Sequence, residues 1–267
     1  MRHPGAVIGL VLLMGLLLLV IIGPSLSPFD PIRLSAERLR PPSWTHPLGT
    51  DQLGRDVLVR LLFGGRISLQ VAIVAVGIGG LVGVCAGVPA GYLGGKPDLV
   101  VMRLIDIVQA FPSILLALAL VSALGPNLHN AILAVGVSSV PSYARVARGS
   151  VLGTKHLPYV DAARVIGAGP LDVMVRHILP NVLPALVVLA TTSAGLAVSA
   201  AASLGFLGLG AQAPLPEWGT MLNDGRNFLR LAWWMATFPG LAIMLMVLAT
   251  NLVGDGLRDA LDPRLRH

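Results

Sequence analysis

The chain has 267 residues, of which 55% are hydrophobic and 12% are charged, and its formal net charge is +6. Because a soluble domain carries about 25% charged residues, this composition excludes disorder and a coiled coil and disfavours a soluble enzyme. The length accommodates about six membrane spans of about 20 residues each, and the positive charge fits basic loops beside lipid better than nucleic-acid binding.

Apolar runs in chain order predict an all-α polytopic membrane protein with six transmembrane helices. The runs cover residues 5–23, 67–93, 99–124, 130–146, 182–209 and 233–253. We interpret the first run as an uncleaved span, because it is longer than a signal-peptide core and no A-x-A site follows it. An even number of spans puts both termini on one side, and the basic residues favour the inner side only weakly.

The second apolar run carries small residues at every fourth position. They are Ala75, Gly79, Gly83, Gly87 and Gly91. On a helix these positions form one stripe, and such a stripe lets a neighbouring helix approach closely. We therefore expect a helix-packing surface here.

Residues with catalytic or metal-binding potential form no recognisable motif. The six histidines are scattered, Cys85 is the only cysteine, and the sequence has no HExxH, G-x-S-x-G or P-loop. We predict no catalytic and no metal-ligating residue, and no ATP binding by a P-loop in this chain. Asp106 is the clear acidic residue within a span, and Arg103 one helical turn away is its expected partner in a structural ion pair.

Polar side chains in the later spans are candidates for lining a solute path or, equally, for bonding to their own helix backbone. They are Gln109, Ser113, Ser138, Ser139, Ser142, Thr191, Thr192, Ser193, Ser199 and Ser203.

The polar stretch 147–181 is longer than an ordinary connection between helices. Its residues favour a helix up to Ile166, a turn at Gly167 and Gly169, and a second helix beginning at Pro170. The apolar residues of the second helix, Leu171, Met174, Val175 and Ile178, recur at helical spacing. The pattern predicts a helix–turn–helix on the membrane surface that docks a partner.

Within this stretch Asp161-Ala162-Ala163, Gly167 and Leu179-Pro180 resemble the EAA signature of ABC-importer permease subunits, with Asp161 standing where that family usually has Glu. Three further segments are similar to the dipeptide and oligopeptide permeases of the C type. They are residues 48–69, residues 204–210 with Trp218-Gly219, and residues 239–263. The resemblance covers nearly the whole chain.

The resemblance implies the type I ABC-importer transmembrane fold. It divides the chain into residues 1–66, the first helix with an extracytoplasmic segment, and residues 67–267, the permease core. It places a bacterial multi-pass protein in the cytoplasmic membrane with both termini in the cytosol. Its implied function is import of di- and oligopeptides.

The partners implied by the resemblance are a similar second permease, two cytoplasmic ATPase subunits that bind ATP and Mg, an extracytoplasmic substrate-binding protein, peptide and lipid. No cofactor in this chain and no nucleic acid are expected. The arginine-rich segment 24–66 is expected to contact the second permease or the binding protein. The residues expected to contact the ATPase are Asp161, Ala162, Ala163, Arg164, Gly167, Leu171, Leu179 and Pro180.

Other functions stay open at this point. A permease of the same kind for nickel, glutathione or another small solute is one. A membrane scaffold that binds a cytosolic partner through 147–181 is another, and an ion-coupled carrier without an ATPase is a third. Solute uptake separates the scaffold from the transporters, and a protonophore separates the carrier from an ATP-driven importer.

Overall fold

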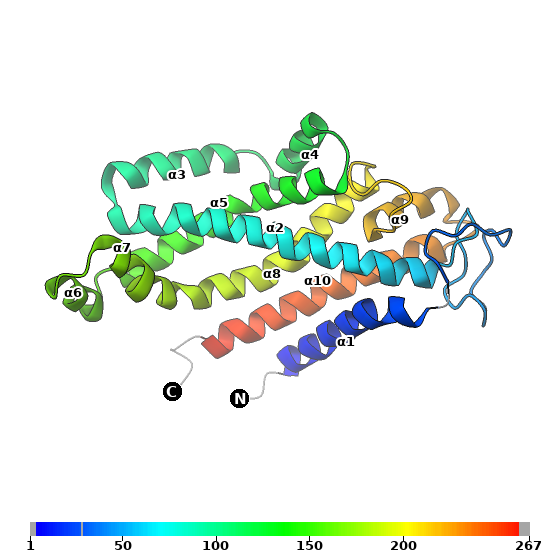
Figure 1. The fold of residues 1–267 in the computed structure, drawn as a ribbon, viewed down its shortest axis with the longest axis horizontal. Coiled ribbons are helices and arrows are strands. Elements are labelled where there is room, and N and C mark those ends of the chain that lie inside the picture. Colours follow the sequence, from blue (N-terminus) through cyan, green and yellow to red (C-terminus); the bar gives the residue numbers. More distant parts are fainter. Residues whose placement is uncertain (1–3, 28, 262–267) are drawn as a thin grey trace.

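The computed structural model describes residues 4–27 and 29–261, which form a bundle of long helices (Figure 1). The long helices are α1 (Pro4–Leu26), α2 (Val57–Leu93), α3 (Gly95–Gln109), α4 (Ser113–Leu124), α5 (Leu128–Thr154), α8 (Leu179–Phe206) and α10 (Trp234–Leu261). The short elements are α6 (Pro158–Val165), α7 (Pro170–Asp172), the π-helical turn η1 (Val173–Ile178), α9 (Trp218–Gly225) and the 3-10 turn η2 (Arg226–Phe228).

Within the described residues four helical stretches are long and apolar enough to cross a membrane, namely α1, α2, 170–206 and α10. The run 99–124, predicted as one span, is instead the pair α3 and α4, bent by 83°, and counts as a fifth crossing if the pair is one span. The expected fourth span, 130–146, lies within α5. This helix is not among those long and apolar enough to cross a membrane. Because α5 packs against α2, α3, α4 and α8, neighbouring helices rather than lipid surround much of it.

The segment between the first two spans folds differently from the prediction at both of its ends. Helix α2 begins ten residues earlier than expected, because the Oδ1 atom of Asp56 accepts a hydrogen bond of 2.9 Å from Val59 N and caps the helix. The predicted division between residues 66 and 67 therefore falls inside a continuous helix and separates no folding units.

Helix α1 continues past Gly23 through Pro24, which has no N–H to donate to the carbonyl of Val20. Arg66 of α2 replaces that donor. Its Nε donates to Val20 O at 3.1 Å and its Nη2 donates to Ile21 O at 2.6 Å. The arginine thus completes the hydrogen bonding of α1 and joins it to α2.

The small-residue stripe of α2 lies against α5, and all five of its members are buried. A Cβ atom added at Gly83 would lie 2.5 Å from the Cβ of Tyr143 and 2.8 Å from the carbonyl oxygen of Val140. One at Gly87 would overlap the backbone of Ala144. The two helices are therefore in backbone-to-backbone contact at these positions, as the spacing predicts.

Different elements lie at the two ends of the bundle (Figure 1). Helix α1 begins and α10 ends at the end that carries α6 and α7, which we call the α6–α7 end. The segment 29–56 and α9 lie at the opposite end, which we call the α9 end. The start of α1 and the end of α10 thus lie at the same end, as they do in a chain that crosses the membrane an even number of times.

Candidate functional site

The helix–turn–helix predicted for 147–181 is present at the α6–α7 end. Gly167 has φ +92, a conformation that favours glycine. Its N–H donates to Arg164 O at 3.0 Å and closes the end of α6. Pro170 is the first residue of α7, with Gly169 as its N-cap. The turn and the start of the second helix are thus where the sequence predicts them.

The outer face of this element is apolar and uncovered by the described chain. Val165 is 86% exposed, Ile166 is 84% exposed and Leu171 is 71% exposed. Asp161 and Ala162 are exposed beside them. Exposed apolar side chains gathered at one end of the bundle form a candidate contact surface for another protein.

Ala163 lies on the opposite face of α6, where it is only 3% exposed and close to the fully buried Val160. The methyl group of Ala163, for which a partner contact is expected, therefore packs into the chain's own core and is not part of the outer face. Of the other expected contact residues, Leu179 is half-buried at the start of α8, and Pro180 is exposed.

The second helix begins with the short α7 and continues as the π-helical turn η1, so it is not the regular helix that the sequence predicts. In a π-helix residues five apart are aligned, and Val173 and Ile178, five apart, are both fully buried. The predicted apolar face is consequently divided, since Ile178 is buried while Leu171 and Val175 are exposed. Val173 and Ile178 hold the element against the bundle, whereas Leu171 and Val175 remain exposed for contact with a partner.

Two contacts at the end of α2 come from α6 and from the end of α5. The guanidinium carbon of Arg164 on α6, whose Nη1 also lies 2.9 Å from Asp161 Oδ1, lies 5.2 Å from the ring centroid of Tyr92. Lys155 Nζ, at the end of α5, donates to Gly91 O at 3.0 Å. Arg164 is therefore a direct contact of α6 with α2.

The acidic residue in the third predicted span has a different partner from the one expected. Asp106 Oδ1 accepts a hydrogen bond of 2.6 Å from Nη2 of Arg145 on α5, not from Arg103 on its own helix. Arg145 is 39 positions away in the chain, so sequence spacing gives no signal for this pair.

Four of the ten candidate path residues come together at the break between α3 and α4. Gln109, Ser113, Ser138 and Ser142 line a cavity of about 290 Å³ with Val108, Phe111, Pro112, Leu116 and Pro141. The hydroxyls of Ser138, Ser139, Thr191, Thr192 and Ser203 donate to carbonyls of their own helices. The backbone-bonding interpretation is confirmed for these five, and Ser138 lines the cavity as well.

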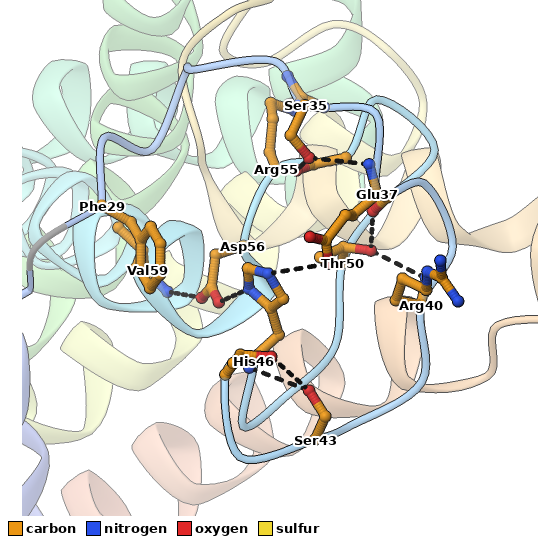
Figure 2. A network of polar contacts seen from close by, with 12 residues as sticks. Phe29, Ser35, Glu37, Arg40, Ser43, His46, Thr50, Arg55, Asp56 and Val59 are labelled. Atoms are coloured by element: carbon orange, nitrogen blue, oxygen red, sulfur yellow. Dashed lines mark hydrogen bonds and ion pairs between the residues drawn. The ribbon is translucent and has the colours of Figure 1, made fainter.

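At the α9 end a network of polar contacts folds the segment 29–56 (Figure 2). His46 Nδ1 lies 2.7 Å from Asp56 Oδ2. The hydroxyl of Thr50 donates to Glu37 O at 2.5 Å, and the hydroxyl of Ser35 donates to Gly54 O at 2.7 Å. The segment is therefore a structured cap on the bundle.

Two arginines of the stretch 48–69 turn inward, although the segment 24–66 that contains them is expected to contact a partner. Arg55 is 4% exposed and Arg60 is 3% exposed. They face Asp51 and, from α9, Asp224. Burial raises the pKa of Asp224 above its usual value, although both guanidiniums act in the opposite direction. Sequence reasoning missed Asp224, which is far from both arginines in the chain.

Comparison with known proteins places this geometry among transporters. Residues 83–267 match the family described as the binding-protein-dependent transport system inner membrane component. Residues 1–42 match the N-terminal transmembrane domain of oligopeptide transport permease C.

Curated relatives match over most of their length. The dipeptide transport system permease protein DppC of Escherichia coli K12 is 48% identical over 273 residues, which cover 100% of this chain and 91% of the relative. The di/tripeptide transport system permease protein DppC of Pseudomonas aeruginosa is 44% identical, with 100% and 90% covered. The glutathione transport system permease protein GsiD of Pectobacterium atrosepticum is 48% identical over 225 residues, with 84% and 75% covered.

Among solved structures, a chain of the inward-facing MetNI methionine ABC transporter superposes with a TM-score of 0.61. It is 23% identical, and the match covers 76% of the present chain and 96% of that chain. At this level of identity the likeness shows the fold, which is that of a type I ABC importer.

Proposed function

The chain belongs to the family of inner-membrane components of binding-protein-dependent transport systems, and from that premise we propose that it is the C-type permease subunit of an importer for dipeptides and short oligopeptides. The family makes it the multi-pass membrane subunit of an ABC importer. The observation that carries the peptide cargo is identity of 44% and 48% with two dipeptide permeases along the whole chain. A glutathione permease is equally similar over a shorter stretch, so glutathione is the second cargo that a specific observation favours.

The α6–α7 end is, in this proposal, the cytosolic end, and its outer face docks an ATPase subunit. Exposed Val165, Ile166 and Leu171 supply apolar contact, and Asp161 and Ala162 border them. ATP and Mg are held by two such partner subunits and not by this chain. Because α1 begins and α10 ends at the same end (Figure 1), both termini are cytosolic as well.

A second, similar permease completes the path, and an extracytoplasmic binding protein delivers the peptide to the α9 end. Closure of the ATPase dimer on ATP moves the docked α6–α7 element. Arg164 on Tyr92 and Lys155 on Gly91 O pass this movement to α2. Since α2 and α5 are in backbone contact, they move as one body, and the path changes from inward-open to outward-open.

The test is uptake of labelled di-, tri- and longer peptides, with glutathione and nickel as parallel cargoes, in cells lacking only this chain. Loss of peptide uptake that the wild-type gene restores supports the proposal. Normal peptide uptake with lost glutathione or nickel uptake overturns the peptide cargo and keeps the transporter. Uptake that needs no ATPase and collapses with a protonophore points to an ion-coupled carrier.

The variant Gly167→Leu tests the coupling role within the same assay. Its side chain would meet open space, so the change strains only the turn at φ +92. Gly169→Leu is the matched control, because Gly169 also faces open space and has no positive φ. We expect Gly167→Leu to insert normally and to lose uptake while ATP hydrolysis continues. Wild-type uptake in this variant contradicts the assignment.

A further inference from the structure

A polar cavity of about 200 Å³ lies at the α9 end. Its polar side chains come from the segment 29–56, from the first turn of α2, from the loop after α8 and from α9. These residues are Gln52, Arg55, Arg60, Gln212, Thr220, Asn223 and Asp224. The volume is several times that of one water in the liquid, which is room for the charged end groups of a short peptide.

The two buried arginines do not use most of their hydrogen-bonding capacity within the described chain. A guanidinium has five N–H donors. Arg55 Nε donates to Asp51 Oδ2 at 2.6 Å, and Arg60 Nη1 donates to Pro31 O at 3.2 Å. The described residues accept no other hydrogen bond from either side chain, and Arg60 Nε lies 3.5 Å from Asp51 Oδ2 as an ion pair. Both arginines line the cavity. Buried cationic donors of this kind fit a carboxylate.

Acceptors line the same cavity. Asp224 Oδ2 lies 3.6 Å from Arg55 Nη2 and 3.8 Å from Arg60 Nη2, which is longer than a hydrogen bond. The buried Oε1 atom of Gln52 has no hydrogen-bonding partner among the described residues. A carboxylate and an unused amide oxygen together fit an ammonium group.

The charges around the cavity balance. Asp51 and Asp224 offset the charges of Arg55 and Arg60, so the four side chains sum to zero. A neutral zwitterion entering this site leaves no net charge buried, whereas an anion or a cation leaves one uncompensated, which is costly away from water.

We propose that this cavity binds the backbone ends of a zwitterionic peptide, with its carboxylate against Arg55 and Arg60 and its ammonium against Asp224 and Gln52. The inference rests on the proposed peptide cargo and gives the signature Asp51 to Arg60 a role in receiving it. The site lies at the α9 end, opposite α6 and α7. In the proposed function the peptide enters the membrane subunit at this α9 end.

The experiment measures direct binding to the assembled transporter in lipid nanodiscs, with no binding protein present. The probes are dialanine, N-acetyl-dialanine, which lacks the ammonium, and dialanine amide, which lacks the carboxylate. Their dissociation constants are measured by saturation-transfer NMR. The test variant is Asp224→Asn, which removes one charge at constant size from a side chain that is 39% exposed. The control is Ser35→Ala, which removes the bond to Gly54 O in the same segment without touching the cavity.

We expect wild type to bind dialanine more tightly than either modified peptide. Asp224→Asn is expected to raise the dissociation constant of dialanine by about tenfold or more, because it removes a charge-assisted contact. N-acetyl-dialanine, an anion, is expected to bind Asp224→Asn at least as tightly as wild type, because the variant site carries one more net positive charge. Ser35→Ala is expected to bind dialanine as wild type does.

Three results overturn the inference. Wild type fails to bind dialanine up to about 10 mM, Asp224→Asn binds it as tightly as wild type, or Ser35→Ala weakens it as much as Asp224→Asn. If one of these results is obtained and peptide uptake by cells still depends on the chain, the cavity inference is wrong and the proposed function is retained. Uptake that does not depend on the chain removes the proposed function itself.

Discussion

The contact between α2 and α5 makes a quantitative prediction at Gly87. A Cβ atom there would lie 3.0 Å from both the Cα and the carbonyl carbon of Ala144 and nearer still to its oxygen. These are backbone atoms of a helix, so no side-chain rotation relieves the overlap, and the helices must separate. Overpacking costs about 1–3 kcal/mol, and rigid neighbours put Gly87→Ala toward the upper end of that range.

The matched control is Gly77→Ala on the same helix, where an added Cβ meets nothing within 4 Å. Both variants gain about 1 kcal/mol of helix propensity, so this term cancels between them. We expect Gly87→Ala to be less stable than Gly77→Ala by about 2–3 kcal/mol, which separates their unfolding midpoints by roughly 5–10 °C in a chain of this size. Thermal unfolding of the purified chain in detergent measures the difference, and a Gly87→Ala midpoint at or above that of Gly77→Ala refutes the close contact.

Three further outcomes follow from single contacts. Arg66→Ala is expected to destabilise the chain by about 1–3 kcal/mol, and Pro24→Ala in that background to recover part of the loss by restoring the missing N–H; no recovery in thermal unfolding would contradict this. Ala163→Leu is expected to lower stability, since the site is buried, whereas Ala162→Leu is expected to stay within about 0.5 kcal/mol and to reduce peptide-stimulated ATP hydrolysis by the assembled transporter. Burial raises the pKa of Glu217 above its usual 4.5, so the folded state binds its proton more tightly and stability falls as pH rises from that value; Glu217→Gln is expected to flatten this slope, and an unchanged slope would rule the group out as its source.

The α6–α7 element shows which features can be predicted from the sequence and which cannot. Gly167 and Pro170 act through local backbone chemistry, so their positions alone predict the turn and the new helix. The π-helical turn gives no such signal, and a regular helical period then assigns the apolar residues to one face. One extra residue in that turn sends Val173 and Ile178 inward and leaves Leu171 exposed. The element is predictable, but the face it presents is not.

The run 99–124 shows the same limit for spans. Its apolarity predicts one continuous helix, while the chain breaks between Gln109 and Ser113. Pro112 is the available signal, because proline disfavours the helical conformation of the residue before it. Composition measures whether a segment tolerates lipid and says nothing of its direction, so a bent pair and a straight span look alike.

Charged pairs are predicted least well, because the partners are distant in sequence. Arg55 and Arg60 sit in a polar, proline-rich segment, and such a setting favours an exposed surface. Asp224 faces them from α9, an element that follows α8 in the chain and lies beside them only in the tertiary fold. The signature residues were therefore recognisable as a group, while their inward orientation required the tertiary fold.

Helix α2 connects the two ends of the molecule. Helix α2 has 37 residues and extends about 55 Å at 1.5 Å per residue. It carries Arg60 at the proposed peptide cavity and, near its other end, Tyr92 beneath the guanidinium of Arg164 on α6. Between these points its small residues hold it against α5. In the proposed mechanism, a displacement of α6 by an ATPase reaches the cavity through this one helix, and the small-residue stripe holds that helix against α5.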